Sequence, residues 1–233
     1  MTLEQLVNDF AIRSFRDQGD EDYISARLAC RAALPSVFLW ACQQTIEKYL
    51  KCILLLNRIP AIRVKHDLGA ALTTINHSGK LTVILTPPTQ DFIKQIDTFG
   101  RFRYFEIPNF ASGTQIIALD RAAWELRRYC TFSLAQRQIV ITDGQPVPKV
   151  RLVGGFLEQI IDDNENPARE PLLWQNAFFG RRRRSRVSVY TWSKMKNSPL
   201  YLHPEILDEV LKYVFLPKDV ITVYRSHKVS KNP

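Results

Sequence analysis

Arg63 and His66 lie three positions apart in one loop, and their residue types suit chemistry at a phosphodiester. A histidine, whose ordinary pKa is about 6.5, can act as acid or base near neutral pH, and an arginine can stabilise negative charge developing on a phosphate. This pair is the candidate catalytic site. The alternative is that His66 and Asp67 cap the following helix and hold the loop in place, which needs only local contacts.

Two groups of cations in the first part of the chain are candidates for nucleic-acid binding. The segment 101–105 mixes guanidinium groups with aromatic rings, so Arg101, Arg103 and Tyr104 could hold phosphates while stacking a base. Its rings could instead complete the core while the arginines are solvated. The second group could line a groove between two helices or form their solvated face. It consists of Arg27, Arg31, Lys48 and Lys51.

A run of arginines in the last third of the chain is the densest charge feature. It consists of Arg181, Arg182, Arg183, Arg184 and Arg186. Each phosphate that such a run neutralises adds to a salt-dependent affinity for nucleic acid. The alternatives are a solvated turn, or a surface for an acidic protein partner such as an antitoxin.

The composition describes a globular chain that favours anionic partners. The chain has 233 residues, of which 45% are hydrophobic, and 32 Lys+Arg against 23 Asp+Glu give a net charge of +9. Residues 151–233 alone hold 14 Lys+Arg and nine Asp+Glu, so the shorter segment is the more basic one. That apolar fraction is enough to build a core, which excludes a disordered or collagen-like chain, but the composition indicates no reaction.

The spacing of cysteines and histidines predicts neither a metal site nor a cofactor. The four cysteines form no Cys-x-x-Cys motif, and none of the four histidines lies within five residues of a cysteine or another histidine. The longest uncharged stretch, 32–46, is too short and too polar to cross a bilayer, and the N-terminus lacks the pattern of a signal peptide. We therefore expect no membrane association and a reduced, cytoplasmic location.

Hydrophobic periodicity predicts a helical bundle over residues 1–136. Apolar residues recur every three or four positions from Phe38 to Leu56 behind Pro35, which is typical of a long helix. Asp67 and Asp120 are the expected N-caps of two later helices. The predicted helices cover 21–34, 35–56, 68–77, 86–99 and a segment starting at 120, with a short amphipathic segment over 3–10. The expected arrangement is antiparallel and up-and-down.

The pattern changes after Gln136, where we place the domain boundary. An Asp-Gly pair between apolar flanks predicts a hairpin or linker over 137–150. Residues 151–233 are predicted to form a smaller, basic α+β extension. Its helices are expected over 155–163, 171–179 and 204–215, and its strands over 187–192 and 220–224. The fold class is therefore mainly α.

Three segments in order resemble the HEPN family of small helical bundles. They are Asp22-Tyr-Ile-Ser-Ala-Arg-Leu28, then Ala41-Cys-Gln-Gln-Thr-Ile-Glu-Lys-Tyr-Leu-Lys51, then His66-Asp-Leu68. The family's signature is Ala-x-Gln-x-x-Glu-Lys-x-Leu-Lys before a His-Asp-Leu, and Cys42 stands here in place of the first alanine. The resemblance covers about residues 20–135 and is strongest over 22–68.

The resemblance implies a bundle that dimerises and acts on RNA or nucleotides in toxin–antitoxin or defence systems. Many family members cleave RNA with an arginine that precedes a histidine by four to six intervening residues. No histidine in this chain has an arginine at that distance, so no catalytic residue is carried over. The chain thus departs from the usual HEPN ribonuclease.

Three functions follow as hypotheses. The first is a non-catalytic or atypical HEPN protein that binds RNA or a nucleotide through a basic surface, as a homodimer. The second is a ribonuclease with a displaced Arg63/His66 or Arg101/Arg103 set. The third is a protein–protein interaction module in which the aromatic segment 174–179 contacts the partner.

Overall fold

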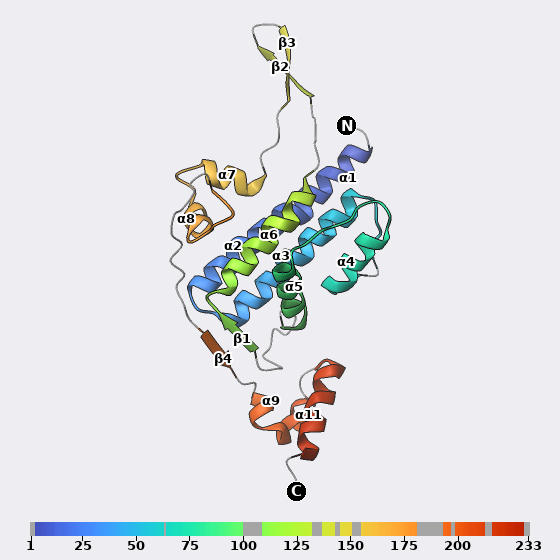
Figure 1. The fold of residues 1–233 in the computed structure, drawn as a ribbon, viewed down its shortest axis with the longest axis vertical. Helices are drawn as coiled ribbons and strands as arrows, with labels where there is room; N and C mark the ends of the chain where they lie inside the picture. Colours follow the sequence, from blue (N-terminus) through green and yellow to red (C-terminus); the bar gives the residue numbers. More distant parts are fainter. Residues whose placement is uncertain are drawn as a thin grey trace.

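The long helix α3 (Pro35–Leu56) lies at the centre of the computed structural model, with other helices around it (Figure 1). The structure describes residues 3–62, 64–99, 109–131, 137–142, 145–150, 155–180, 193–196, 199–212 and 216–230. The described part of the chain is mainly helical, as predicted. α3 begins at Pro35 and ends at Leu56, which confirms the predicted range. Its side chains are buried on more than one face, because helices pack around it.

The N-terminal helices run together before α3. α1 (Leu3–Ala11) passes through a π-helical segment (Ile12–Asp17) into α2 (Gln18–Arg31). α2 packs closely against α3. It ends three residues earlier than predicted, because the backbone of Ala33 has φ of 53° before Pro35 starts the next helix.

Two further helices cover α3 from the other side. α4 (Leu68–His77) has its predicted range, and the Asp67 side chain caps it by accepting a hydrogen bond from the backbone nitrogen of Ala70 at 2.6 Å. The predicted cap is therefore confirmed. α5 (Pro87–Phe99) packs against both α3 and α4.

α6 (Gln115–Arg127) corrects one prediction, because it begins five residues before Asp120. Asp120 is therefore not a cap but a buried side chain in the middle of the helix. It accepts hydrogen bonds from Tyr23 and Arg27 of α2, and these contacts compensate for the burial of its carboxylate. A short 3-10 turn (Arg128–Cys130) follows α6.

The predicted hairpin is present. β2 (Arg137–Thr142) and β3 (Gln145–Val150) pair antiparallel, with Thr142 opposite Gln145, and they project away from the helices in Figure 1. The hairpin does not divide the hydrophobic core, however. α7 (Phe156–Asp162) and α8 (Arg169–Leu173) follow it, and Leu157, Ile160 and Leu172 belong to the same core as α2, α3 and α6. α8 ends earlier than the helix predicted over 171–179.

The C-terminal region is joined to the bundle by a second strand pair. β1 (Asn109–Ser112) pairs antiparallel with β4 (Ser193–Lys196), while the strand predicted over 187–192 lies outside the described residues. The last helical elements have their own small core of Leu200, Leu207, Leu216, Val220 and Tyr224. These elements are α9 (Pro199–Leu202), a 3-10 turn (Pro204–Ile206), α10 (Leu207–Val210) and α11 (Lys218–Ser230).

The strand predicted over 220–224 is wrong, because these residues lie within α11. Val220 and Tyr224 are four positions apart, so a helix brings both to one buried face, and this packing outweighs the β propensity of the segment. The helix predicted over 204–215 is present only as short turns through Val210 in the described residues. None of the described helices combines the length and the apolar character needed to cross a membrane.

Candidate functional site

Five of the predicted site residues lie in the described part of the structure: Arg27, Arg31, Lys48, Lys51 and His66. The others lie outside the described residues. They are Arg63, Arg101, Arg103, Tyr104, Arg181, Arg182, Arg183, Arg184 and Arg186.

Arg27 is a core residue, so the prediction of an exposed cation at this position is wrong. It is 1% exposed and forms an ion pair with Asp120 of α6. Its other guanidinium nitrogens donate hydrogen bonds to the backbone oxygens of Pro171, at 3.0 Å, and Trp174. Arg27 thus joins α2 to α6 and to the turn after α8. Because its guanidinium is hydrogen-bonded to these buried groups, it is not presented to a ligand.

The three remaining cations of the predicted groove each contact an acid. Arg31 pairs with Glu170 of α8, Lys48 with Asp22 of α2, and Lys51 with Glu47 one turn earlier in α3, at 2.6 Å. A cation already paired with a carboxylate attracts a phosphate less strongly, because the two charges largely cancel at a distance. The surface between α2 and α3 is therefore close to neutral at Arg31, Lys48 and Lys51.

His66 and Glu47 form a histidine–carboxylate pair, which is the main polar feature on this side of the bundle. The His66 Nδ1 atom lies 3.0 Å from Glu47 Oε1 and 3.1 Å from Oε2. The imidazole is 71% exposed, whereas the Glu47 side chain is only 8% exposed. An ionised carboxylate can only accept hydrogen bonds, so Nδ1 carries the proton in this contact, and in the neutral form of the imidazole Nε2 is the acceptor. Among the described residues, none forms a hydrogen bond with Nε2.

The fold holds this pair in place from α3. Gln43, one turn before Glu47, donates hydrogen bonds to Glu47 Oε2 at 3.0 Å and to the backbone oxygen of His66 at 3.3 Å. Lys65, next to the histidine, has φ of 50°, a left-handed conformation that costs a residue with a side chain on the order of 1 kcal/mol. Of the two residues predicted to cap α4, Asp67 does so, whereas the His66 side chain holds the loop through its contact with Glu47.

The carboxyl group of Glu47 has a pKa below its usual value. Burial alone would raise this pKa, but the hydrogen bonds and charges of Lys51 and His66 more than offset that effect. Because the folded-state pKa is lower than the unfolded one, ionised Glu47 stabilises the fold above the unfolded pKa. That contribution is lost as the pH falls through the folded pKa.

We therefore expect Glu47→Gln to lower the free energy of unfolding by about 1–2 kcal/mol at neutral pH, where hydrogen bonds to a charged group are lost. The difference from the wild type should shrink as the pH falls through the folded pKa of Glu47. Urea denaturation at a series of pH values measures it, with Glu165→Gln, at an exposed position, as the control. An equal difference at every pH would contradict the pKa shift.

The sequence alone missed the burial of Glu47. Its i,i+4 spacing with Lys51 suits the ion pair that the structure shows, but that spacing gives no sign that Glu47 is buried. His66, shortly before α4, contacts Glu47, 19 positions earlier on α3. The signals in the sequence that pointed to this loop were the residue types of Arg63 and His66 and the His-Asp-Leu segment of the family resemblance.

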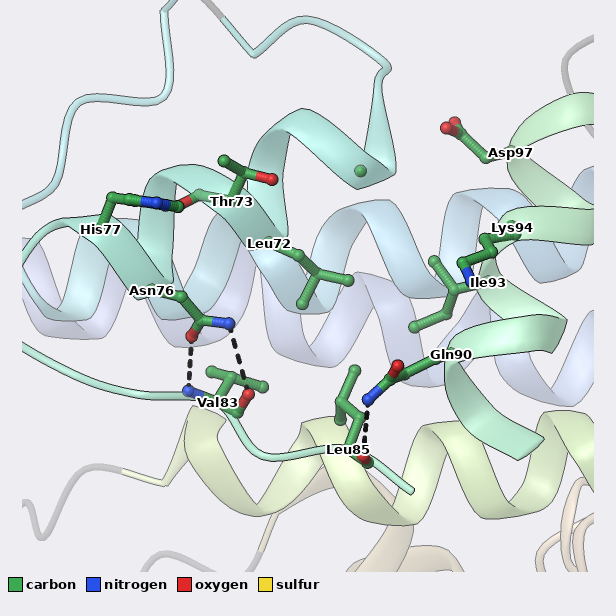
Figure 2. Close-up of a pocket in the computed structure, with 11 residues that line it drawn as sticks. Leu72, Thr73, Asn76, His77, Val83, Leu85, Gln90, Ile93, Lys94 and Asp97 are labelled. Carbon is green, nitrogen blue, oxygen red and sulfur yellow. Dashed lines mark hydrogen bonds between the residues drawn. The ribbon is translucent and has the colours of Figure 1, made fainter. Parts of the chain in front are cut away.

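A pocket of about 360 Å³ lies between α4, α5 and the segment joining them (Figure 2). Its lining residues are Gly69, Leu72, Thr73, Asn76, His77, Val83, Leu85, Gln90, Ile93, Lys94 and Asp97. The side-chain amides of Asn76 and Gln90 form hydrogen bonds with the backbone. Asn76 Oδ1 accepts from the Val83 nitrogen at 2.7 Å, and Gln90 donates to the Leu85 oxygen at 2.9 Å. Lys94 and Asp97 are left as the charged groups of the pocket, whose interior is formed by Leu72 and Ile93.

Comparison of the chain with protein-family models, curated proteins and solved structures gave no match.

Proposed function

We propose that the protein is an atypical HEPN-like protein that binds RNA or a nucleotide, as a homodimer. The observation that carries the proposal is the cluster of Glu47, Lys51 and His66 on α3 and its covering loop. These residues come from two separate segments of the HEPN resemblance, and they meet at the surface with an imidazole edge turned outward. An imidazole in that position can hydrogen-bond a phosphate or a ribose hydroxyl.

The charge distribution supports an anionic ligand. The ranges 100–108 and 181–192 together hold seven arginines and one acid, so they supply six of the nine excess positive charges. The cations of α2 and α3 are paired with acids, so these arginines are the charges that the proposal assigns to the phosphates.

The experiment measures the binding of a fluorescein-labelled single-stranded RNA by fluorescence anisotropy at several salt concentrations. We expect the variant with Arg181, Arg182, Arg183 and Arg184 all changed to alanine to bind at least about tenfold more weakly. Each lost phosphate contact should reduce the slope of log K against log salt by about 0.7 for a single strand.

The matched control removes four other cations whose side chains are exposed: Arg13, Lys94, Lys212 and Arg225. It loses the same total charge, so it should bind RNA nearly as the wild type does. An equal loss in both variants would mean that only net charge matters, and unchanged binding in the first variant would remove the arginine run from the proposal.

A second candidate function, RNA cleavage, is favoured by the contact between Glu47 and His66. In this reaction His66 Nε2 takes the proton of a ribose 2′-hydroxyl, whose oxygen attacks the adjacent phosphorus while the 5′-oxygen of the next nucleotide leaves with a proton from solvent. Ionised Glu47 would stabilise the imidazolium that forms, as a carboxylate behind a catalytic histidine does. The candidate general base is therefore His66, with Glu47 as a positioning residue.

A further inference from the structure

Arginines and aromatic rings alternate on a surface formed by α2, α6 and the turn after α8. The Arg31 guanidinium lies 5.3 Å from the centre of the Trp174 ring, and that of Arg121 lies 5.9 Å from the Phe178 ring. Trp124 packs edge-on against Phe179 at 5.6 Å and is 49% exposed. We call Arg31, Arg121, Trp124, Trp174 and Phe178 the Arg–aromatic surface. Figure 1 shows α2 and α6 side by side, with α8 next to them.

Buried hydrogen bonds fix the turn that carries two of these rings. Asn176 is 5% exposed, and its Nδ2 donates to the Tyr23 hydroxyl at 2.8 Å and to the Leu172 oxygen at 2.9 Å. Its Oδ1 accepts from the backbone nitrogens of Phe178 and Phe179, both at 3.0 Å. Arg27 holds the other end of the turn through the Trp174 oxygen. The rings are therefore held in position before any ligand arrives, which lowers the entropic cost of binding.

A half-exposed tryptophan beside partly buried rings and guanidinium groups matches the chemistry of unpaired bases. Bases of a single strand stack on aromatic rings and on arginine planes, while neighbouring cations neutralise the phosphates. On this surface Arg121 is assigned to a phosphate, because Arg31 is already paired with Glu170. Bases in a duplex are already stacked on each other and present only their edges, so they cannot use such rings without unpairing. The turn ends at Gly180, directly before the arginine run in the sequence.

We infer that the Arg–aromatic surface binds single-stranded RNA by stacking its bases, with Trp124 as the main stacking residue. This inference rests on the proposed function, because it specifies which form of RNA the protein takes. The occupant is RNA rather than a protein because the chain has a net charge of +9 and the turn leads in the sequence into five arginines, which complement the phosphates of a nucleic acid.

The experiment compares Trp124→Ala with Tyr201→Ala, which removes an aromatic ring of similar exposure, 46%, from α9. Labelled single-stranded RNA and the same RNA as a duplex are titrated with each protein at several salt concentrations. We expect Trp124→Ala to weaken single-strand binding about fivefold or more, as loss of one stacked base does, with an unchanged salt slope. The control should match the wild type, and the wild type should prefer the single strand.

Arg121→Ala is the second variant and keeps the test decisive if Trp124→Ala unfolds, which thermal denaturation would reveal. It should weaken single-strand binding and lower the salt slope slightly. Wild-type affinity in Trp124→Ala and Arg121→Ala, with weakened binding in the arginine-run variant, would overturn this inference while the proposed function stands. No RNA binding by the wild type at low salt would overturn both.

Discussion

Changing Arg127 to methionine should lower the free energy of unfolding by about 3–5 kcal/mol, the cost of leaving a buried charge without its partner. Arg127 of α6 binds Asp20 of α2 through two hydrogen bonds of 2.8 and 2.9 Å, and Asp20 is fully buried. It also binds Glu158 of α7 at 2.5 and 2.7 Å. Methionine can fill most of the volume, but it supplies no donor for the Asp20 carboxylate.

The pKa of Asp20 and two control variants make this prediction more specific. Burial raises the pKa of Asp20 even with Arg127 beside it, so the carboxyl in the variant should take up a proton more readily. Arg13→Met, at an exposed position, should change stability by less than about 0.5 kcal/mol. Glu158→Gln should cost less than about 1 kcal/mol, because the Glu158 side chain is half exposed. Urea denaturation measures the free energy of unfolding of the three variants. A loss below about 1 kcal/mol for Arg127→Met would contradict the proposed role of the Arg127–Asp20 pair.

If the protein cleaves RNA, His66→Ala should reduce the rate at least about 100-fold, the lower end of the contribution of a general acid or base. Purified protein is incubated with labelled RNA and a chelator, and the products are separated on a gel. His77→Ala is the matched control, since this exposed histidine lies on α4 and contacts the backbone oxygen of Thr73 at 2.9 Å. Glu47→Gln should reduce the rate less than His66→Ala does, because the imidazole remains.

Cleavage that survives His66→Ala would rule out His66 as the general base. A wild type that binds RNA but leaves it intact would restrict the proposal to binding, which is the function expected of a chain without the usual HEPN arginine–histidine spacing.

Local interactions explain which elements were predictable from the sequence. α3 could be predicted to the residue because Pro35 suits a first turn and apolar residues recur at helical spacing to Leu56. The Asp67 cap was predictable for the same reason, since the carboxylate and the Ala70 nitrogen are three positions apart.

The mistakes involve contacts between residues far apart in the chain. Asp120 has the residue type of a cap, but its partners Tyr23 and Arg27 lie 97 and 93 positions away, and no local pattern indicates them. Arg27 was expected in a groove or on the solvated face, because arginine is rarely buried without a partner. It is buried here because it pairs with Asp120, which the sequence does not indicate. Within α11, the β-branched residues predicted a strand, and only the packing of the C-terminal elements favours the helix.

In the candidate site, too, residues could be chosen from local features of the sequence, but their distant partners could not. His66 could be chosen from its residue type and its place in a loop, but its carboxylate partner could not, because Glu47 looks like an ordinary surface residue of a helix. The Arg–aromatic surface was visible only as the aromatic segment 174–179, since Trp124 and Arg121 join it from another helix.

The most direct test of the central claim is a titration of labelled single-stranded RNA with the wild-type protein between about 50 and 200 mM salt. We predict binding at the lowest salt and an affinity that falls linearly on a log–log plot, with a slope of about −0.7 for each phosphate neutralised. No binding at the lowest salt, or an affinity that does not depend on salt, would contradict the proposal that this protein binds RNA through its basic surface.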